Sequence, residues 1–371
     1  MAVWTVVCER CGAEDRLDSA GWRCPHCGAA WTLCSPDRLD PASLHPAEHT
    51  IWRYEQVLPV SRPEAVSLGE GMTPLIPGKL SSRPVWFKLD FLLPTGSFKD
   101  RGAAVLVSYL RRLGYRRLVV DSSGNAAAAL AAYCAAAGLA CHVFAPAATS
   151  PAKLAQARAY GAQLTLVEGS REQVAVAAQQ AAAADPAAAY ASHNWHPVFV
   201  EGTKTWLLEV WEQLGGRFPA ACFLPVGGGS LLLGAWRACQ ALPSPYPKLV
   251  VAQPLACAPI AKALERGDTD VPPVTPSSTL AEGARIAAPP RGRQVLGAVR
   301  GSGGWAEAIG EDLLVDTLHQ LWRQGLYAEP TAALGAAAFR QALKRGQPLP
   351  EGEVVIVLTG SGLKTGALIL E

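Results

Sequence analysis

Short apolar runs alternate with longer alanine-rich stretches along most of the chain. A stretch such as Ala126–Ala137 is long enough for a helix and is followed by Gly138. We expect strands at Leu118–Val120, Cys141–Phe144, Gln163–Val167, Cys222–Pro225, Leu249–Gln253 and Val354–Leu358. Strands separated by helices predict parallel sheets covered by helices, the doubly wound α/β arrangement.

Three regions lack this alternation. The stretch from Leu39 to Arg83 is rich in proline, glycine and serine, and we expect it to wrap around the folded core. Asp185–Ala191 and Val271–Ser278 are predicted loops because they are dominated by proline and small residues.

The first 34 residues contain five of the ten cysteines. Cys8 and Cys11, and then Cys24 and Cys27, form two Cys-x-x-Cys-Gly knuckles. Two knuckles can supply the four ligands of a closed, structural zinc site. Iron is the alternative ion for these ligands, and disulfides or empty thiols are the alternatives to a metal. We expect Cys34 and His26, which lie nearby, to take no part.

Lys99 is the strongest candidate for chemistry. It follows a Pro-Thr-Gly-Ser turn and precedes the apolar run Ala103–Leu110, which places it in the first turn of a helix. The positive end of the helix dipole there disfavours a second positive charge. A neutral lysine amine can form a Schiff base with a carbonyl compound. The alternative is an ordinary solvated lysine.

Three predicted strands run directly into loops of small residues, and such loops hold ligands in open α/β sheets. The loops are Asp121–Asn125, Val226–Ser230 and Thr359–Gly362. The glycines of the second loop precede a predicted helix, Leu231–Ala241, so backbone N–H groups there can cradle a phosphate. An aldehyde-reactive lysine together with a phosphate cradle indicates pyridoxal 5′-phosphate.

Composition narrows the classes of function. The 371 residues are enough for about two domains, and the net charge of +2 favours neither nucleic acid nor a strongly charged partner. No secretory signal and no stretch long enough to span a bilayer is apparent. We therefore expect a soluble, cytoplasmic protein. Only 17% of the residues are charged, which hints at burial between subunits.

The lysine motif Pro94–Gly102 resembles that of the threonine synthases, which are fold-type II (tryptophan synthase β-like) pyridoxal-phosphate enzymes. Further stretches resemble motifs of this family in the same order, namely Leu68–Leu75, Ser122–Asn125 and Thr359–Lys364. The resemblance runs from about Ser67 to the C-terminus, and some members carry an N-terminal segment like a zinc ribbon.

The resemblance implies a domain arrangement. It implies two doubly wound, three-layer α/β domains and a small zinc-ribbon-like module at residues 1–38. The large, coenzyme-binding domain would comprise residues 39–95 and 196–371. The small domain, residues 96–195, would carry the lysine and the asparagine loop. A homodimer is expected.

The resemblance also implies roles for individual residues. Lys99 would hold the coenzyme as a Schiff base and move protons, and Asn125 would bond to the 3′ oxygen of the ring. Thr359 would donate to the pyridine nitrogen, with Ser361 as the second candidate. The coenzyme phosphate would be held by Gly227, Gly228, Gly229 and Ser230. The substrate carboxylate would be bound by Ser122, Ser123 and Gly124, although loop capping is the structural alternative for the serines.

The implied reaction converts O-phospho-L-homoserine and water to L-threonine and phosphate. One position departs from the family, because many threonine synthases carry an arginine where Phe199 stands, and phenylalanine cannot bind a phosphate. His193, Asn194 and Lys204 are the nearby candidates for that contact. The alternative enzyme is an ammonia-lyase acting on serine, threonine or another β-substituted amino acid. The non-enzyme alternative is a binding or regulatory protein built around the metal module.

Overall fold

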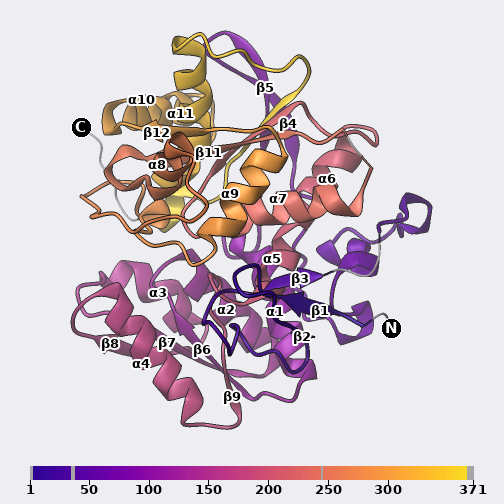
Figure 1. Cartoon of the computed structure of the whole chain (residues 1–371), viewed down its shortest axis with the longest axis vertical. Coiled ribbons are helices and arrows are strands. Elements are labelled where there is room, and N and C mark those ends of the chain that lie inside the picture. Colours follow the sequence, from indigo (N-terminus) through magenta and orange to yellow (C-terminus); the bar gives the residue numbers. More distant parts are fainter. Residues whose placement is uncertain (1–2, 35–37, 244, 366–371) are drawn as a thin grey trace. The chain divides into compact units, whose positions relative to one another are not determined.

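The computed structural model describes residues 3–34, 38–243 and 245–365, and the chain folds into two compact units (Figure 1). The first unit contains the described residues of Met1–Gly71 together with Lys99–Thr203. The second contains Met72–Phe98 and Lys204–Lys364.

The first unit is built on a four-stranded parallel sheet in the order β8-β7-β6-β9. Its strands are β6 (Arg117–Asp121), β7 (Ala140–Pro146), β8 (Gln163–Val167) and β9 (Ala188–Tyr190). Its helices are α1 (Lys99–Arg112), α2 (Asn125–Ala137), α3 (Pro151–Ala159), α4 (Arg171–Ala183) and α5 (Pro197–Thr203).

Strand β6 shows that this sheet is covered on both faces. Leu118 and Val120 belong to a core that includes α1 and α2, whereas Val119 belongs to a second core with residues of α4. Successive side chains of a strand point to opposite faces. Helices therefore cover both faces, as the continuous apolar runs predicted.

A close crossing of α1 and α5 depends on two glycines. A methyl group at Gly202 would lie 2.1 Å from the carbonyl oxygen of Arg101, and one at Gly102 would lie 2.5 Å from the ring of Phe199. A larger side chain at Gly202 would displace the backbone of one helix, and a larger side chain at Gly102 would displace the ring of Phe199. The helices therefore lie close enough for Phe199 to pack on α1 at the turn that begins with Lys99.

The N-terminal module shares the core of the first unit. Strands β1 (Thr5–Val7), β2 (Glu14–Arg16) and β3 (Thr32–Cys34) form an antiparallel sheet in the order β2-β1-β3. The buried side chains of Val6, Trp31 and Leu33 belong to the same hydrophobic cluster as α1 and α2. Because burial of apolar area is the main stabilising term, the module contributes to the stability of the whole unit.

The second unit is built on a six-stranded sheet in the order β12-β11-β10-β13-β5-β4, parallel except for β4. Its strands are β4 (Leu75–Leu80), β5 (Arg83–Lys88), β10 (Ala221–Pro225), β11 (Lys248–Pro254), β12 (Ala306–Ile309) and β13 (Val354–Val357). Its helices are α6 (Thr205–Gln213), α7 (Ser230–Ala241), α8 (Pro259–Arg266), α9 (Gly292–Gly301), α10 (Glu311–Arg323) and α11 (Pro330–Lys344).

A buried ion pair ties β5 to α6 within the second unit. Lys88 Nζ lies 2.6 Å from Glu209 Oε2, and both side chains are fully buried. Lys88 also donates to the carbonyl oxygen of Thr73, and Thr73 Oγ1 donates to Asp90 Oδ1. These bonds satisfy the buried charges, which would otherwise be strongly destabilising.

Most of the predicted elements are confirmed, and one expectation is wrong. Each of the six expected strands is present to within a residue or two of its ends. The segment Asp185–Ala191, expected as a loop, contains strand β9, which pairs with β6. Strand β4, at Leu75–Leu80 within the segment Leu39–Arg83, was not predicted from the sequence. Within the part of the chain that the structure describes, no helix has the length and hydrophobicity needed to cross a membrane.

The α1–α5 crossing generates a stability prediction. Gly202→Ala should lower the free energy of unfolding by about 1–3 kcal/mol because the added methyl collides with backbone that cannot rotate away. Gly297→Ala is the matched control, since Gly297 lies inside α9 with open space at its Cβ position. It should be neutral or slightly stabilising. Urea unfolding of both variants measures the difference in their free energies of unfolding. Equal values for the two variants would contradict the close approach of α1 and α5 at Gly202.

Candidate functional site and metal centre

Lys99 is the first residue of α1 and is partly buried, which confirms the predicted helix position. Its Nζ lies 5.9 Å from the centre of the Phe199 ring, and Phe199 itself is fully buried. The amine therefore lies beside an apolar wall supplied by α5.

His193 extends this wall. Its ring centre lies 5.9 Å from that of Phe199, and its Nδ1 is buried with no hydrogen-bond partner among the described residues. Burial, and then the positive charges of Lys99 and Arg171, hold the pKa of His193 well below its ordinary value. The imidazole is therefore neutral near pH 7 and can act as a hydrogen-bonding group but not as a cation.

The loop Ser122–Asn125 leads from β6 into α2. Asn125 is the first residue of α2, and Ser122 Oγ accepts a hydrogen bond from the backbone N–H of Gly124 at 3.4 Å. Helices α1 and α2 pack against each other. The structure thus brings Lys99 and Asn125 into one unit, each at the N-terminal end of a helix. Backbone N–H groups at such an end bind carboxylates well.

The sequence reasoning missed the polar groups beside this loop. Tyr190 ends β9 and Ser192 follows it, and both are close enough to Asp121 to affect its ionisation. Burial raises the pKa of Asp121, while these two hydroxyls oppose the shift. Tyr190 and Ser192 lie close to Asp121 because β9 pairs with β6. The expectation of a loop at residues 185–191 gave no indication of this pairing.

Glu70, within the stretch Leu68–Leu75, connects three parts of the first unit. Its carboxylate accepts hydrogen bonds from Trp52 Nε1 at 3.0 Å and from Tyr133 Oη at 2.8 Å, and Tyr133 lies on α2. It also accepts from the backbone N–H of Leu68. Burial raises the pKa of Glu70, although these hydrogen bonds act to lower it. The residue holds α2, and with it the Asn125 loop, against the N-terminal segment.

In the second unit, the glycine loop follows β10 and precedes α7. A methyl group at Gly229 would lie 2.4 Å from Val295 Cγ2, and the φ angle of +93° there also favours glycine. A methyl group at Gly227 would lie 2.8 Å from the carbonyl oxygen of Gly283. The loop therefore exposes backbone rather than side chains at the start of α7, and this suits a phosphate group.

Thr359 follows β13 at the same edge of the sheet, because β10 and β13 are parallel neighbours. Thr359 and Ser361 are both buried. The carbonyl oxygen of Thr359 accepts from the backbone N–H of Phe98, and the N–H of Ser361 donates to the carbonyl oxygen of Gly96. These bonds connect the end of β13 to residues 96 and 98 through backbone atoms alone. The side-chain hydroxyl of Thr359 takes no part in them.

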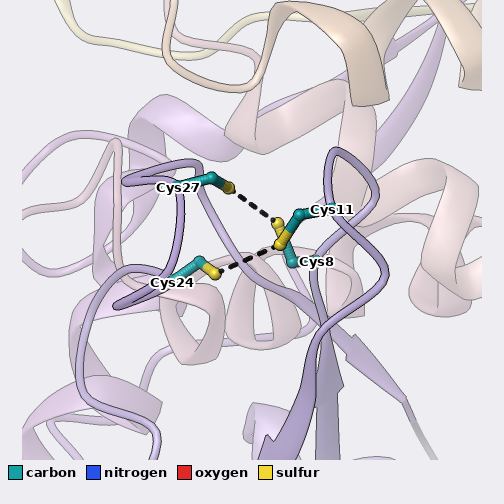
Figure 2. A group of neighbouring side chains, drawn as sticks. All are labelled: Cys8, Cys11, Cys24 and Cys27. Carbon is teal, nitrogen blue, oxygen red and sulfur yellow. Dashed lines mark hydrogen bonds between the residues drawn. The ribbon is translucent and has the colours of Figure 1, made fainter.

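The four cysteines of the knuckles converge (Figure 2). The sulfur atoms of Cys8, Cys11, Cys24 and Cys27 all lie within 4.8 Å of one another. Cys8 Sγ lies 3.4 Å from Cys27 Sγ, and Cys11 Sγ lies 3.6 Å from Cys24 Sγ. A tetrahedral zinc ion with bonds of about 2.3 Å would place its sulfurs roughly 3.8 Å apart. The donor set and its spacing therefore fit such an ion, and all ten cysteines are free thiols.

The two knuckles have the same backbone hydrogen bonds. In the first, the N–H of Cys8 donates to Ala13 and that of Gly12 donates to Cys8. In the second, Cys24 and Gly28 make the corresponding bonds, with Ala29 as the acceptor for Cys24. The same local fold thus presents each pair of thiols.

The ionisation of the thiols is uneven. Burial opposes charge on Cys8, but hydrogen bonds from backbone N–H groups lower the pKa of Cys8 to about 7. The pKa of Cys11 is raised to about 12, because burial and the neighbouring sulfurs outweigh a backbone N–H. Several thiolates so close together repel one another unless a cation lies among them, and a divalent ion would remove this penalty.

Known proteins are similar to this chain in both sequence and fold. The family model described as "Pyridoxal-phosphate dependent enzyme" matches residues 66–360. The threonine synthase of Methanocaldococcus jannaschii is 31% identical, with 96% of this chain and 92% of that protein covered. The threonine synthase of Methanosarcina acetivorans is 29% identical, with 98% and 93% covered. Matches of this extent must reach into the N-terminal cysteine module.

A solved structure of a threonine deaminase from T.th. superposes with a TM-score of 0.68 at 30% sequence identity. The superposition covers 78% of this chain and 92% of that one. The likeness therefore includes most of the fold described above.

The cysteine geometry generates a prediction about metal content. We expect the protein to hold one divalent ion per chain and Cys11→Ser to lose it, because a fourth thiolate closes the coordination shell. Cys34→Ser is the control, since Cys34 is exposed and lies outside the cluster. Elemental analysis after reconstitution under reducing conditions measures both. Equal metal loss from the two variants would contradict the assignment.

Proposed function

The chain belongs to the pyridoxal-phosphate-dependent enzymes and is a lyase of the threonine synthase type, and from this we propose that it converts O-phospho-L-homoserine and water to L-threonine and phosphate. The observation that carries the proposal is the likeness to threonine synthases over nearly the whole chain, N-terminal module included. The likeness to the threonine deaminase covers less of the chain.

The donor groups described above within each unit are of the kinds that would bind the coenzyme. Pyridoxal phosphate, when bound, would supply an electron sink for charge developing at the α carbon of the substrate. The backbone of Gly227 and Gly229, at the start of α7, would hold its phosphate. Thr359 would donate its hydroxyl to the pyridine nitrogen, and Asn125 would donate to the ring oxygen. A hydroxyl in place of a carboxylate leaves that nitrogen uncharged.

Lys99 would perform the proton transfers. Its amine would take a proton from the α carbon and then one from the β carbon, after which phosphate leaves from the γ carbon. One proton would return to the γ carbon, the oxygen of water would then add at the β carbon, and the other proton would return to the α carbon. The proton that water gives up balances the one taken up by the released phosphate. The ring of Phe199 would bound one side of the space around this amine. One water is consumed and one phosphate is released in each cycle.

The substrate carboxylate would be bound by the loop before α2. Its hydroxyls, from Ser122 and Ser123, and the backbone N–H groups near Gly124 lie at the N-terminal end of that helix. Both hydroxyls and helix N-terminal N–H groups are suitable donors to a carboxylate. The four cysteines, in turn, are proposed to hold zinc with no position open to substrate, in a structural role.

The surroundings of Lys99 favour a second candidate function, an ammonia-lyase acting on serine, threonine or a related amino acid. Phe199 is apolar and His193 is neutral, so neither of these two side chains supplies a cation to a dianionic phosphate. The likeness to a threonine deaminase supports the same alternative. This enzyme would use the same lysine and coenzyme and would need no second phosphate site.

The products distinguish the two candidates. The coenzyme-loaded protein should release phosphate from O-phospho-L-homoserine and form threonine, both identified by mass spectrometry. Formation of a 2-oxo acid and ammonia from serine or threonine, without phosphate release, would instead identify the ammonia-lyase.

Lys99→Ala should reduce turnover by about 10²–10⁴-fold, the usual contribution of a positioned acid–base group, or abolish it. Lys262→Ala is the control, because Lys262 is exposed on α8. Steady-state rates with saturating coenzyme measure the effect. Normal turnover by the Lys99 variant would contradict its assigned role.

Gly229→Ala should weaken binding of the coenzyme by about tenfold or more, because the added methyl meets Val295 and distorts the cradle. Gly310→Ala should leave it unchanged, since nothing lies near its Cβ position. Titration of the apoprotein followed by absorbance measures both affinities. If the two variants bound the coenzyme with the same affinity, the coenzyme phosphate would have to be bound elsewhere.

A further inference from the structure

Trp22 connects the metal knuckles to the wall beside Lys99. It lies between the two knuckles in sequence, two residues before Cys24, which is buried. Its ring meets Tyr190 edge-on at 4.8 Å between centres, and Trp195 edge-on at 5.4 Å. Such edge-to-face pairs are favourable beyond their buried area and fix the relative orientation of the rings.

The segment contacted by Trp22 carries the side chains that surround the lysine. Tyr190 ends β9, and Trp195 lies two residues before the first residue of α5. Between and just beyond them lie His193 and Phe199, whose rings form the wall described above. Trp22 therefore contacts this segment on both sides of His193.

The same module also holds the helix that begins at Lys99. Tyr109, on α1, donates a buried hydrogen bond of 2.9 Å to the carbonyl oxygen of Leu17. Arg112, also on α1, forms an ion pair of 2.9 Å with Asp18. The loop between the knuckles thus contacts α1 through residues 17 and 18, and the His193 segment through Trp22.

From these contacts we propose that Trp22 is a positioning residue through which the metal-loaded knuckles fix His193 and Phe199 relative to Lys99. A bound ion would fix the second knuckle, at Cys24, and so limit the positions that the Trp22 ring can take. Loss of the ion would release the ring and loosen residues 188–200. The metal would then set substrate affinity without touching substrate.

The proposal implies reciprocity. If the ion favours the ordered wall, ligands that order the wall must in turn strengthen retention of the ion. Removing Trp22 should break this coupling in both directions, whereas the remaining contacts of the module with α1 should persist.

The test uses hydrogen–deuterium exchange of the intact, coenzyme-loaded protein. Trp22→Ala should retain its metal, yet exchange faster in residues 188–200. Its KM should rise by about fivefold, the scale of a lost aromatic pair, with a smaller change in kcat. Trp22→Phe, which keeps an aromatic edge, should restore both. Glu14→Ala, an exposed position on β2 of the same module, is the control and should match the wild type.

Metal removal by a chelator completes the test. In the wild type it should raise exchange in residues 188–200, and in Trp22→Ala it should add little there, because the connection is already broken. Wild-type exchange in metal-loaded Trp22→Ala would overturn the proposal. So would increased exchange spread evenly over the first unit, since that would mean general destabilisation. The inference rests on the proposed role of Lys99, but exchange is read without substrate, so the two can fail separately.

Discussion

The close approach of α1 and α5 is the constraint on which the surroundings of Lys99 depend. Glycine at 102 and at 202 lets the two backbones come together, and the space left at Gly102 is filled by the ring of Phe199. One contact therefore fixes where the lysine helix begins relative to its apolar wall. A larger residue at Gly202 would collide with the backbone of α1, and one at Gly102 would collide with the ring of Phe199. Helix packing thus determines which side chain lies against the first turn of α1.

Most of the fold could be predicted from the sequence because most of its helices and strands have a recognisable local sequence pattern. Helices at Lys99, Asn125 and Ser230 follow small-residue loops, and buried parallel strands are continuous apolar runs. Strand β9 was missed because it has three residues and is held by pairing with β6, which local pattern does not encode. Strand β4 was missed because it contains Pro77 and Gly78, which edge strands tolerate.

The candidate site could likewise be predicted only in part from the sequence. The residues proposed to carry the chemistry, Lys99, Asn125 and the glycine loop, could be predicted from spacing and from resemblance to a family. Their neighbours could not be, because the proximity of Tyr190 to Asp121, or of Trp22 to Trp195, is set by tertiary packing alone. Phe199 was noticed as a departure from the family, and the structure adds that it is buried against the lysine helix. The N-terminal module shares a hydrophobic core with that helix.

If Lys99 holds the coenzyme as a Schiff base, chemical reduction should fix the coenzyme to this lysine. The coenzyme-loaded protein is reduced with borohydride, digested and analysed by mass spectrometry for the lysine that carries the pyridoxyl group. We expect the label on the peptide that contains Lys99, with other lysines unmodified. A label on a different lysine, or a loaded protein that cannot be labelled, would contradict it.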